Sequence, residues 1–294
     1  MQVSANGIAI EVEDHGPPQG EPLVLIMGLG MQLVAWPEGF VAQLVARGFR
    51  VVRFDNRDIG KSQGFDHLGV PNLAADAFRH TVGLPVRSPY RLADMADDTA
   101  ALLDVLGLRS AHVCGASMGG MIAQHLAVRH PARVRSVTLM MTTTGARRLP
   151  QPSWKVRAAM LSRPADPSNL DSVIDHLVRI VRLIGSPGYP TPEAELRERI
   201  ARAVHRAYHP QGVARQLVAI VADGDRSPML AGLRAPVQIL HGRADPLVPM
   251  AAGLDLHARI AGSQIDLIDG MGHDLPTLLW PRFVDGIAAA AARA

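Results

Sequence analysis

The sequence predicts an α/β fold, in which a doubly wound, mostly parallel sheet is interrupted by an inserted helical cap. Short apolar runs typical of buried strands alternate with amphipathic helices in residues 1–144 and again in residues 233–294. Such alternation builds a parallel sheet with helices on both faces. Residues 145–232 show helical patterns without convincing strands. We therefore expect a two-part core, 1–144 and 233–294, and a cap at 145–232.

Three strands are predicted before the first long loop. Residues 7–13 alternate apolar and polar side chains, as a half-exposed strand does, and residues 23–27 form a continuous apolar run that suits a strand buried on both faces. A short helix at 40–47 precedes the strand 49–54. Residues 56–88 are rich in Gly, Pro and polar residues, so we expect a long surface excursion there.

The rest of the first core part follows the same rhythm. Residues 91–106 place their leucines and a methionine on one face of an amphipathic helix, and Gly107 is expected to end it. A strand at 110–114, a helix at 118–129 and a strand at 134–141 then follow.

Two helices are predicted in the cap. One spans 170–183, and the other opens with Thr191 as N-cap and Pro192 at the first helical position. The α/β pattern resumes with a strand at 236–240, a helix at 251–260, a strand at 264–268 and a terminal helix from 277.

The composition excludes several classes of protein. Apolar residues make up 48% and charged residues 19%, so a sizeable core is expected rather than disorder. The net charge is only +3, and Lys61 and Lys155 are the only lysines, so no basic stripe for nucleic acid is expected. No apolar run approaches the ~18 residues of a membrane span. With one cysteine, Cys114, neither an internal disulfide nor a multi-cysteine metal cage is expected.

The first residues carry neither a basic segment nor a long apolar segment, so no signal peptide is expected and the predicted compartment is the cytoplasm.

Residues 115–120, GASMGG, contain the pattern G-x-S-x-G and make Ser117 a candidate nucleophile. The pattern lies between a predicted strand and a predicted helix. At such a sharp bend bulky neighbours would clash, and Gly115 and Gly119 remove those side chains. Because a serine hydroxyl is a weak nucleophile, it needs a base and a third group that orients the base.

His273 and Asp245 are the candidate base and acid. His273 lies among glycines just beyond the last predicted strand, and Asp245 lies in a turn after the strand 236–240. The alternative position for the acid, after the strand 134–141, offers only threonines and a glycine. An alternative interpretation is that Asp245 is an ordinary turn aspartate before a proline, with no catalytic role. His241, at a strand end, is expected to be structural.

Two backbone amides are candidates for an oxyanion hole. The amide of Met118 opens a helix, where free N–H groups favour negative charge. A second donor is expected from Gly28-Leu29-Gly30, with Leu29 N–H as the choice. A phosphate loop does not fit there, because Leu33 occupies the final glycine position of that motif.

Met31, Gly28 and Met121 are candidates for lining an apolar substrate pocket, since methionines adapt to irregular shapes. For Met121, filling the core is an equally good interpretation.

The order Ser117, Asp245, His273 and the interrupted α/β pattern resemble the α/β-hydrolase fold superfamily over nearly the whole chain. The matches are 115–120 for the nucleophile turn, Gly242-Arg243-Ala244-Asp245 for the acid and Gly272-His273 for the base. Residues 55–62 also resemble the stretch D-x-R-G-x-G-x-S of that family. The chain looks most similar to bacterial carboxylesterase-type members, including the aclacinomycin methylesterase group. The resemblance implies an eight-stranded sheet and a Ser-His-Asp triad.

The sequence departs from the family pattern at three places. Met27-Gly28 stands where His-Gly is usual, Asp58 replaces a glycine, and the 63–89 segment is extended and a candidate for the entrance. Arg57 and Asp58 are candidates for a structural ion pair. Relatives with an aspartate nucleophile are disfavoured, because Ser117 occupies that position.

We therefore expect a serine hydrolase that cleaves carboxylic esters of small to medium apolar substrates through an acyl-enzyme. No metal and no organic cofactor are expected, and the sequence does not indicate an oligomeric state. A lactonase, a cofactor-free perhydrolase or an acyltransferase would use the same triad. From another class, a non-catalytic hydrolase-like ligand receptor is the alternative, against which the complete triad argues.

Overall fold

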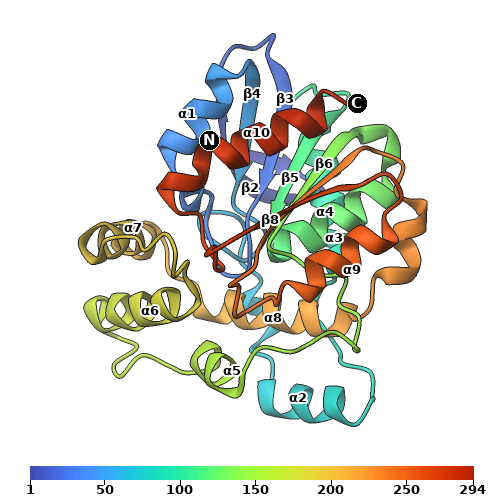
Figure 1. Cartoon of the computed structure of the whole chain (residues 1–294). Coiled ribbons are helices and arrows are strands. Elements are labelled where there is room, and N and C mark those ends of the chain that lie inside the picture. The colour runs from blue at the N-terminus through green and yellow to red at the C-terminus, as the bar shows by residue number, and fades with distance from the viewer.

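A single eight-stranded sheet, with the strand order β1-β2-β4-β3-β5-β6-β7-β8, forms the centre of the computed structural model, which describes all residues 1–294 (Figure 1). The pairs β1–β2 and β2–β4 are antiparallel, and all the pairs from β4 to β8 are parallel. The strands are β1 (Gln2–Ala5), β2 (Ile8–His15), β3 (Glu21–Ile26), β4 (Phe49–Phe54), β5 (Ala111–Ala116), β6 (Val134–Met140), β7 (Val237–Gly242) and β8 (Gln264–Ile268).

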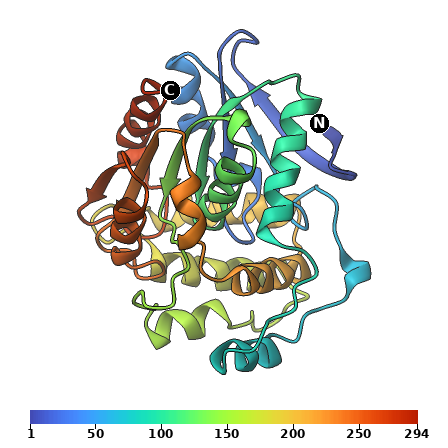
Figure 2. The ribbon, with the colours of Figure 1, turned by 90° about the vertical axis from the view of Figure 1, so that its right-hand side faces the viewer.

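Helices cover both faces of this sheet, as the alternating sequence pattern predicts. In Figure 2 the sheet is seen between α10 at the left and α3 at the right. One face carries α1 (Glu38–Ala46) and α10 (Trp280–Ala291), and the other carries α3 (Leu92–Val105), α4 (Met118–Arg129) and α9 (Ala251–Arg259). None of the helices has the length and apolar character needed to cross a bilayer.

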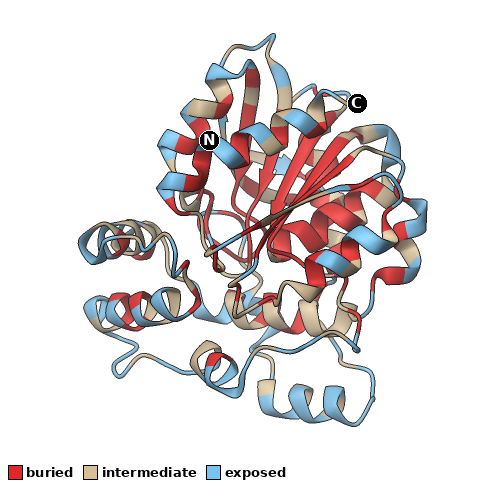
Figure 3. Cartoon of the chain, in the orientation of Figure 1, coloured by how far each residue is buried: buried red, intermediate tan, exposed pale blue.

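Strand β3 shows how one sequence supplies two cores. Leu23 and Leu25 pack in the cluster formed with α1 and α10, while Val24 and Ile26 pack in the cluster formed with α3 and α4. All four side chains are fully buried, which confirms the prediction of a strand buried on both faces. Figure 3 shows the same burial along the central strands, in red.

The chain between β6 and β7 is helical, and we call residues 145–232 the cap segment. Its helices are α5 (Trp154–Met160), α6 (Leu170–Ile184), α7 (Glu193–Arg206) and α8 (Pro210–Asp223), followed by a 3-10 helix. Helices α6 and α7 share a small core of their own, formed by Val173, Ile174, Val178, Leu196 and Val204. The cap segment lies below the sheet in Figure 1.

Several elements differ from the prediction. Helix α7 begins one residue later than expected, because Pro192, not Thr191, takes the N-cap position. Strand β1 and helices α5 and α8 were not predicted individually, because their sequences show no distinct pattern of apolar residues. The expected excursion at 56–88 contains helix α2 (Leu73–Thr81), whose N-cap Asn72 accepts a hydrogen bond from Ala75 N–H.

Arg57 and Asp58 are both in buried ion pairs, but with different partners rather than with each other. Arg57 donates two hydrogen bonds of 2.6 Å to Asp98. Asp58 binds Arg215 of α8 through two contacts of 2.7 Å and also accepts from the hydroxyl of Tyr90 at 2.9 Å. Burial, together with the Asp58 carboxylate, raises the pKa of Tyr90, so that hydroxyl stays a donor.

The backbone explains why a glycine is usual at position 58. Asp58 has a φ of +72°, in the left-handed region that glycine tolerates best and aspartate tolerates better than most residues. Its carboxylate gives the loop after β4 a strong link to the cap segment.

Candidate active site

Ser117 lies in the turn between β5 and α4, with φ 55° and ψ −118°. This conformation is strained for a residue with a side chain and persists only where the surroundings enforce it. Ser117 N–H donates to Met140 O at 2.9 Å, and the Thr142 hydroxyl donates to Ser117 O at 2.7 Å. The strained backbone is therefore held from strand β6 and the residues after it.

The glycines around Ser117 are required by close backbone approach. A Cβ on Gly115 would overlap the carbonyl oxygen of Gly119, and a Cβ on Gly119 would overlap that of Ile26. A Cβ on Gly120 would lie 2.6 Å from Thr142 Cγ2. The steric reason that the sequence suggested for the motif is confirmed.

Ser117, His273 and Asp245 form one hydrogen-bonded chain. His273 Nε2 lies 3.0 Å from Ser117 Oγ, and His273 Nδ1 lies 2.7 Å from Asp245 Oδ2. Asp245 Oδ1 accepts from the amides of Leu247 at 2.9 Å and Val248 at 2.8 Å. Because an ionised carboxylate only accepts, the Nδ1 of His273 carries the proton and the lone pair of Nε2 faces the serine hydroxyl.

The three side chains come from loops at the same edge of the sheet. Ser117 follows β5, Asp245 follows β7 and His273 follows β8, and the carboxyl ends of parallel strands meet at one edge. The Asp245 side chain is fully buried, and the His273 side chain is 8% exposed. The hydrogen bonds between them are therefore shielded from water.

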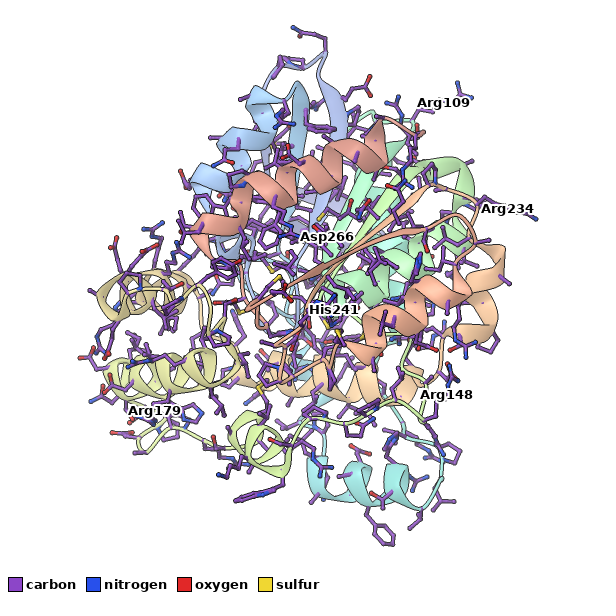
Figure 4. All side chains as sticks on the ribbon, viewed as in Figure 1. Arg109, Arg148, Arg179, Arg234, His241 and Asp266 are labelled. Atoms are coloured by element: carbon purple, nitrogen blue, oxygen red, sulfur yellow. The ribbon has the colours of Figure 1, made fainter.

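His241 is close to this chain but is occupied elsewhere. Figure 4 labels it near the centre of the molecule, and it is fully buried. Its Nε2 donates to Val248 O at 2.8 Å, and its Nδ1 has no partner and packs against Gly253. Burial lowers the pKa of His241 and keeps the ring neutral. This placement agrees with the structural role expected for it, since it holds the turn whose Val248 amide binds Asp245.

The loop after β3 lies directly against Ser117. A Cβ on Gly28 would be 3.1 Å from Ser117 Cβ and 3.7 Å from Ser117 Oγ. The amide of Leu29 makes no hydrogen bond within the protein, whereas the next amide, of Gly30, donates to Gln216 of α8 at 2.9 Å. The amide of Met118 opens α4, where the helix itself provides no acceptor. The Met118 amide is thus next to Ser117 in the chain, the Leu29 amide lies in the loop that packs against Ser117, and neither amide has a hydrogen-bond partner in the protein.

The methionines expected at the substrate pocket divide between surface and core. Met31 is 45% exposed, and Met121 is 6% exposed and belongs to the core cluster with α3 and α4. For Met121 the placement favours the core-filling interpretation over a pocket role. Met118, whose side chain is fully buried, also belongs to that cluster.

Gln216 and Ser186 are two cap-segment residues that bind the loops of the site and that were not among the predicted site residues. Gln216 contacts Gly30 across 186 positions of sequence, and Ser186 accepts a hydrogen bond from Gly272 N–H across 86 positions. Neither belongs to a local motif, so only the tertiary structure reveals them.

Comparison with known proteins agrees with this architecture. The family model described as alpha/beta hydrolase fold matches residues 21–276. Rhodomycin D methylesterase DauP from Streptomyces sp. (strain C5) is 27% identical over 295 residues, covering 93% of this chain and 92% of that protein. The 3-oxoadipate enol-lactonase 2 of Acinetobacter baylyi is 25% identical over 271 residues, covering 91% of this chain and 87% of that protein.

The crystal structure of the enol-lactonase from Burkholderia xenovorans LB400 superposes with a TM-score of 0.75 at 21% identity. The alignment covers 99% of this chain and 100% of that chain, so the likeness extends over the whole fold. The fold and the match of the family model together show that this chain is a member of the α/β hydrolase fold family of hydrolases.

Proposed function

We propose that this protein is a serine hydrolase that cleaves carboxylic esters of small to medium apolar substrates through an acyl-enzyme. The observation that carries this proposal is the continuous chain from Ser117 Oγ to His273 Nε2 at 3.0 Å and from His273 Nδ1 to Asp245 Oδ2 at 2.7 Å. Both distances lie within hydrogen-bond reach, as nucleophilic catalysis requires.

In the first half-reaction, Ser117 Oγ attacks the ester carbonyl carbon while His273 Nε2 takes the hydroxyl proton. The amides of Leu29 and Met118 donate to the oxygen that becomes negative, and such a donor is typically worth about 10²–10³ in rate. His273 then gives its proton to the leaving alcohol, and the acyl group remains on Ser117.

In the second half-reaction, His273 takes a proton from water, whose oxygen attacks the acyl carbonyl. Return of the proton to Ser117 Oγ releases the carboxylic acid. Throughout, Asp245 holds the ring of His273 in one tautomer and stabilises its cation.

We further propose that the cap segment roofs the substrate. Its main chain reaches the base directly, because His273 N–H donates to Ile184 O at 2.7 Å. A roof built from α6 to α8 would set the size of the acyl group that fits above Ser117.

Lactone hydrolysis is a second candidate function, favoured by the similarity to an enol-lactonase. The chemistry is the same, except that the leaving alcohol stays attached to the acyl group. Perhydrolysis and acyl transfer differ only in the acceptor of the acyl group, so peroxide, alcohol or thiol added to the assay would reveal them.

The test is hydrolysis of a panel of p-nitrophenyl esters, methyl esters of apolar acids and lactones by the wild type, by Ser117→Ala and by a control, Ser168→Ala. Ser168 is exposed and lies in the cap segment. We expect Ser117→Ala to lose about 10³-fold or more in kcat, with the control unchanged. A preference for lactones would select the second candidate. If the wild type binds the substrates but hydrolyses none of them, the protein is a ligand receptor and the proposed enzymatic function is refuted.

A further inference from the structure

Two loops of the proposed active site are held by side chains of the cap segment as well as by the sheet. The first, residues 270–274, carries His273, and we call it the histidine loop. The second, residues 28–30, carries the Leu29 amide, and we call it the glycine loop. Both connections are hydrogen bonds between residues far apart in sequence, buried for Ser186 and half-buried for Gln216.

Ser186, just after α6, bonds to the histidine loop on two sides. Its Oγ accepts from Gly272 N–H at 2.8 Å and donates its own proton to the carboxylate of Asp274. Two residues earlier in the cap segment, Ile184 O accepts from His273 N–H at 2.7 Å. Burial raises the pKa of Asp274, and the hydrogen bond from the Ser186 hydroxyl acts in the opposite direction because it stabilises the carboxylate. Ser186 itself is only 4% exposed.

The two backbones approach too closely for side chains to lie between them. A Cβ on Gly272 would overlap the carbonyl oxygen of Gly185. A Cβ on Gly270 would lie 2.9 Å from the Cα of Gly188, and Gly188 N–H donates to Gly270 O at 2.9 Å. A shift of the cap backbone at this joint therefore moves the histidine loop with it.

Gln216, on α8, makes the corresponding connection to the glycine loop. It is fully buried. Its Oε1 accepts from Gly30 N–H at 2.9 Å, and its Nε2 donates to Arg57 O at 2.9 Å. Gly30 has a φ of +69°, and a Cβ there would be 3.0 Å from Val213 Cγ2 of the same helix. Gln216 thus fixes the peptide that immediately follows Leu29.

We propose that Ser186 and Gln216 are positioning residues of the active site. Ser186 aligns the loop that carries His273, and Gln216 aligns the loop whose Leu29 amide receives the oxyanion. The inference rests on the ester hydrolysis proposed above. Each side chain acts through the backbone that it holds, so the cap segment completes the catalytic geometry in addition to covering the substrate.

The experiment compares the wild type with Ser186→Ala, Ser186→Thr and Gln216→Leu. Two control variants change the same residue types on the same or the preceding cap helix. Ser172→Ala removes a hydroxyl of α6 that accepts from Asp166 N–H, and Gln211→Leu changes an exposed residue of α8. The measurements are kcat and KM on the best ester, the rate of labelling by a fluorophosphonate, and the melting temperature.

We expect Ser186→Ala and Gln216→Leu to lower kcat by about tenfold to a hundredfold, as loss of supporting hydrogen bonds does elsewhere. KM should stay within about threefold, because substrate contacts are intact. The labelling rate should fall with kcat, since it reports the same attack by Ser117. Ser186→Thr retains the hydroxyl and is expected to recover most of the rate, and both control variants should match the wild type.

Variants that keep kcat and labelling within about twofold of an active wild type would overturn the inference and leave the proposed function standing. Equal losses in Ser186→Ala and Ser172→Ala would overturn it as well. A wild type that neither cleaves esters nor reacts with the fluorophosphonate would overturn the proposed function and this inference with it. If Ser186→Ala does not fold, Ser186→Cys takes its place, because its sulfur lies at the position of the hydroxyl but is a weaker hydrogen-bond acceptor. An unchanged rate then refutes the role.

Discussion

Replacing Asp58 with Asn removes one charge from the buried ion pair between the loop after β4 and helix α8. Asp58 and Arg215 are each 1% exposed, and the carboxylate accepts hydrogen bonds from Arg215, Phe65 N–H and Tyr90. Asn tolerates the positive φ of this position, so the substitution tests the charge without adding backbone strain. In Asp58→Asn the Nδ2 amide group is a donor, and it faces Arg215, Phe65 N–H and Tyr90, which are donors as well.

The expected cost follows from what remains around Arg215. Breaking a buried pair by removing one partner typically costs 3–5 kcal/mol, so about 3 kcal/mol is expected here. The lower end applies because Arg215 keeps a 2.8 Å bond to Gly69 O and a 2.7 Å contact with Asp66, which is 66% exposed on its side chain. Arg215→Met should cost a similar amount. The double variant removes both charges, and we expect it to be about 3 kcal/mol more stable than the sum of the single costs predicts.

The assay is urea unfolding at pH 7.5, followed by far-UV circular dichroism, on the wild type, the two single variants and the double variant, with Asp76→Asn on α2 as control. Burial alone would raise the pKa of Asp58, but its hydrogen bonds, led by those from Arg215, hold the pKa below its usual value. A lowered pKa contributes stability above the ordinary Asp pKa of about 4, and that stability is lost as the pH falls further. The gap between wild type and Asp58→Asn should therefore narrow below pH 4. A single-variant cost under about 1 kcal/mol, or strictly additive costs, would refute the reasoning.

Three further predictions concern the site. Gly28→Ala places a Cβ 3.1 Å from Ser117 Cβ, so kcat should fall about tenfold with little change in melting temperature; equal activity would contradict the close packing. Asp245→Asn should lower kcat by about 10³–10⁴-fold in steady-state assays, because His273 loses the acceptor at Nδ1 that sets its tautomer, and a loss below tenfold would count against that role. Burial lowers the pKa of His241, so its contribution to stability is present above pH 6.5 and is lost as the pH falls. His241→Gln should accordingly flatten the loss of melting temperature between pH 7.5 and 5.5, and parallel curves would speak against it.

Where local sequence determines local structure, prediction from the sequence succeeded. Helix α4 and strand β8 have the predicted bounds, 118–129 and 264–268, because their apolar patterns are clear and their ends are marked. Of the elements that were missed, β1, α2 and α5 are short or exposed, whereas α8 has 14 residues and buries polar and small side chains, such as Arg215 and Gln216, in place of an apolar stripe. Strand β1 has four residues at the edge of the sheet, and α2 has no buried side chain, so neither leaves a strong apolar pattern.

The candidate site likewise has a part that could be predicted from the sequence and a part that could not. The positions of Ser117, Asp245 and His273 follow from strand ends and turn residues, which are local features. The contacts of Ser186 and Gln216 depend on how the cap segment packs against the core. No motif or residue spacing in the sequence predicts them. Likewise, the ion-pair partner of Asp58 lies 157 residues away, on a helix that had no distinct signal.

The central claim, that Ser117 is a nucleophile activated by His273, is tested most directly by a fluorophosphonate. Wild type, Ser117→Ala and His273→Gln are incubated with the reagent, and intact mass with peptide mapping locates the adduct. We expect one adduct on Ser117 in the wild type, none in Ser117→Ala and labelling at least about tenfold slower in His273→Gln. Equal labelling of the wild type and Ser117→Ala, or an adduct on another residue, would contradict it.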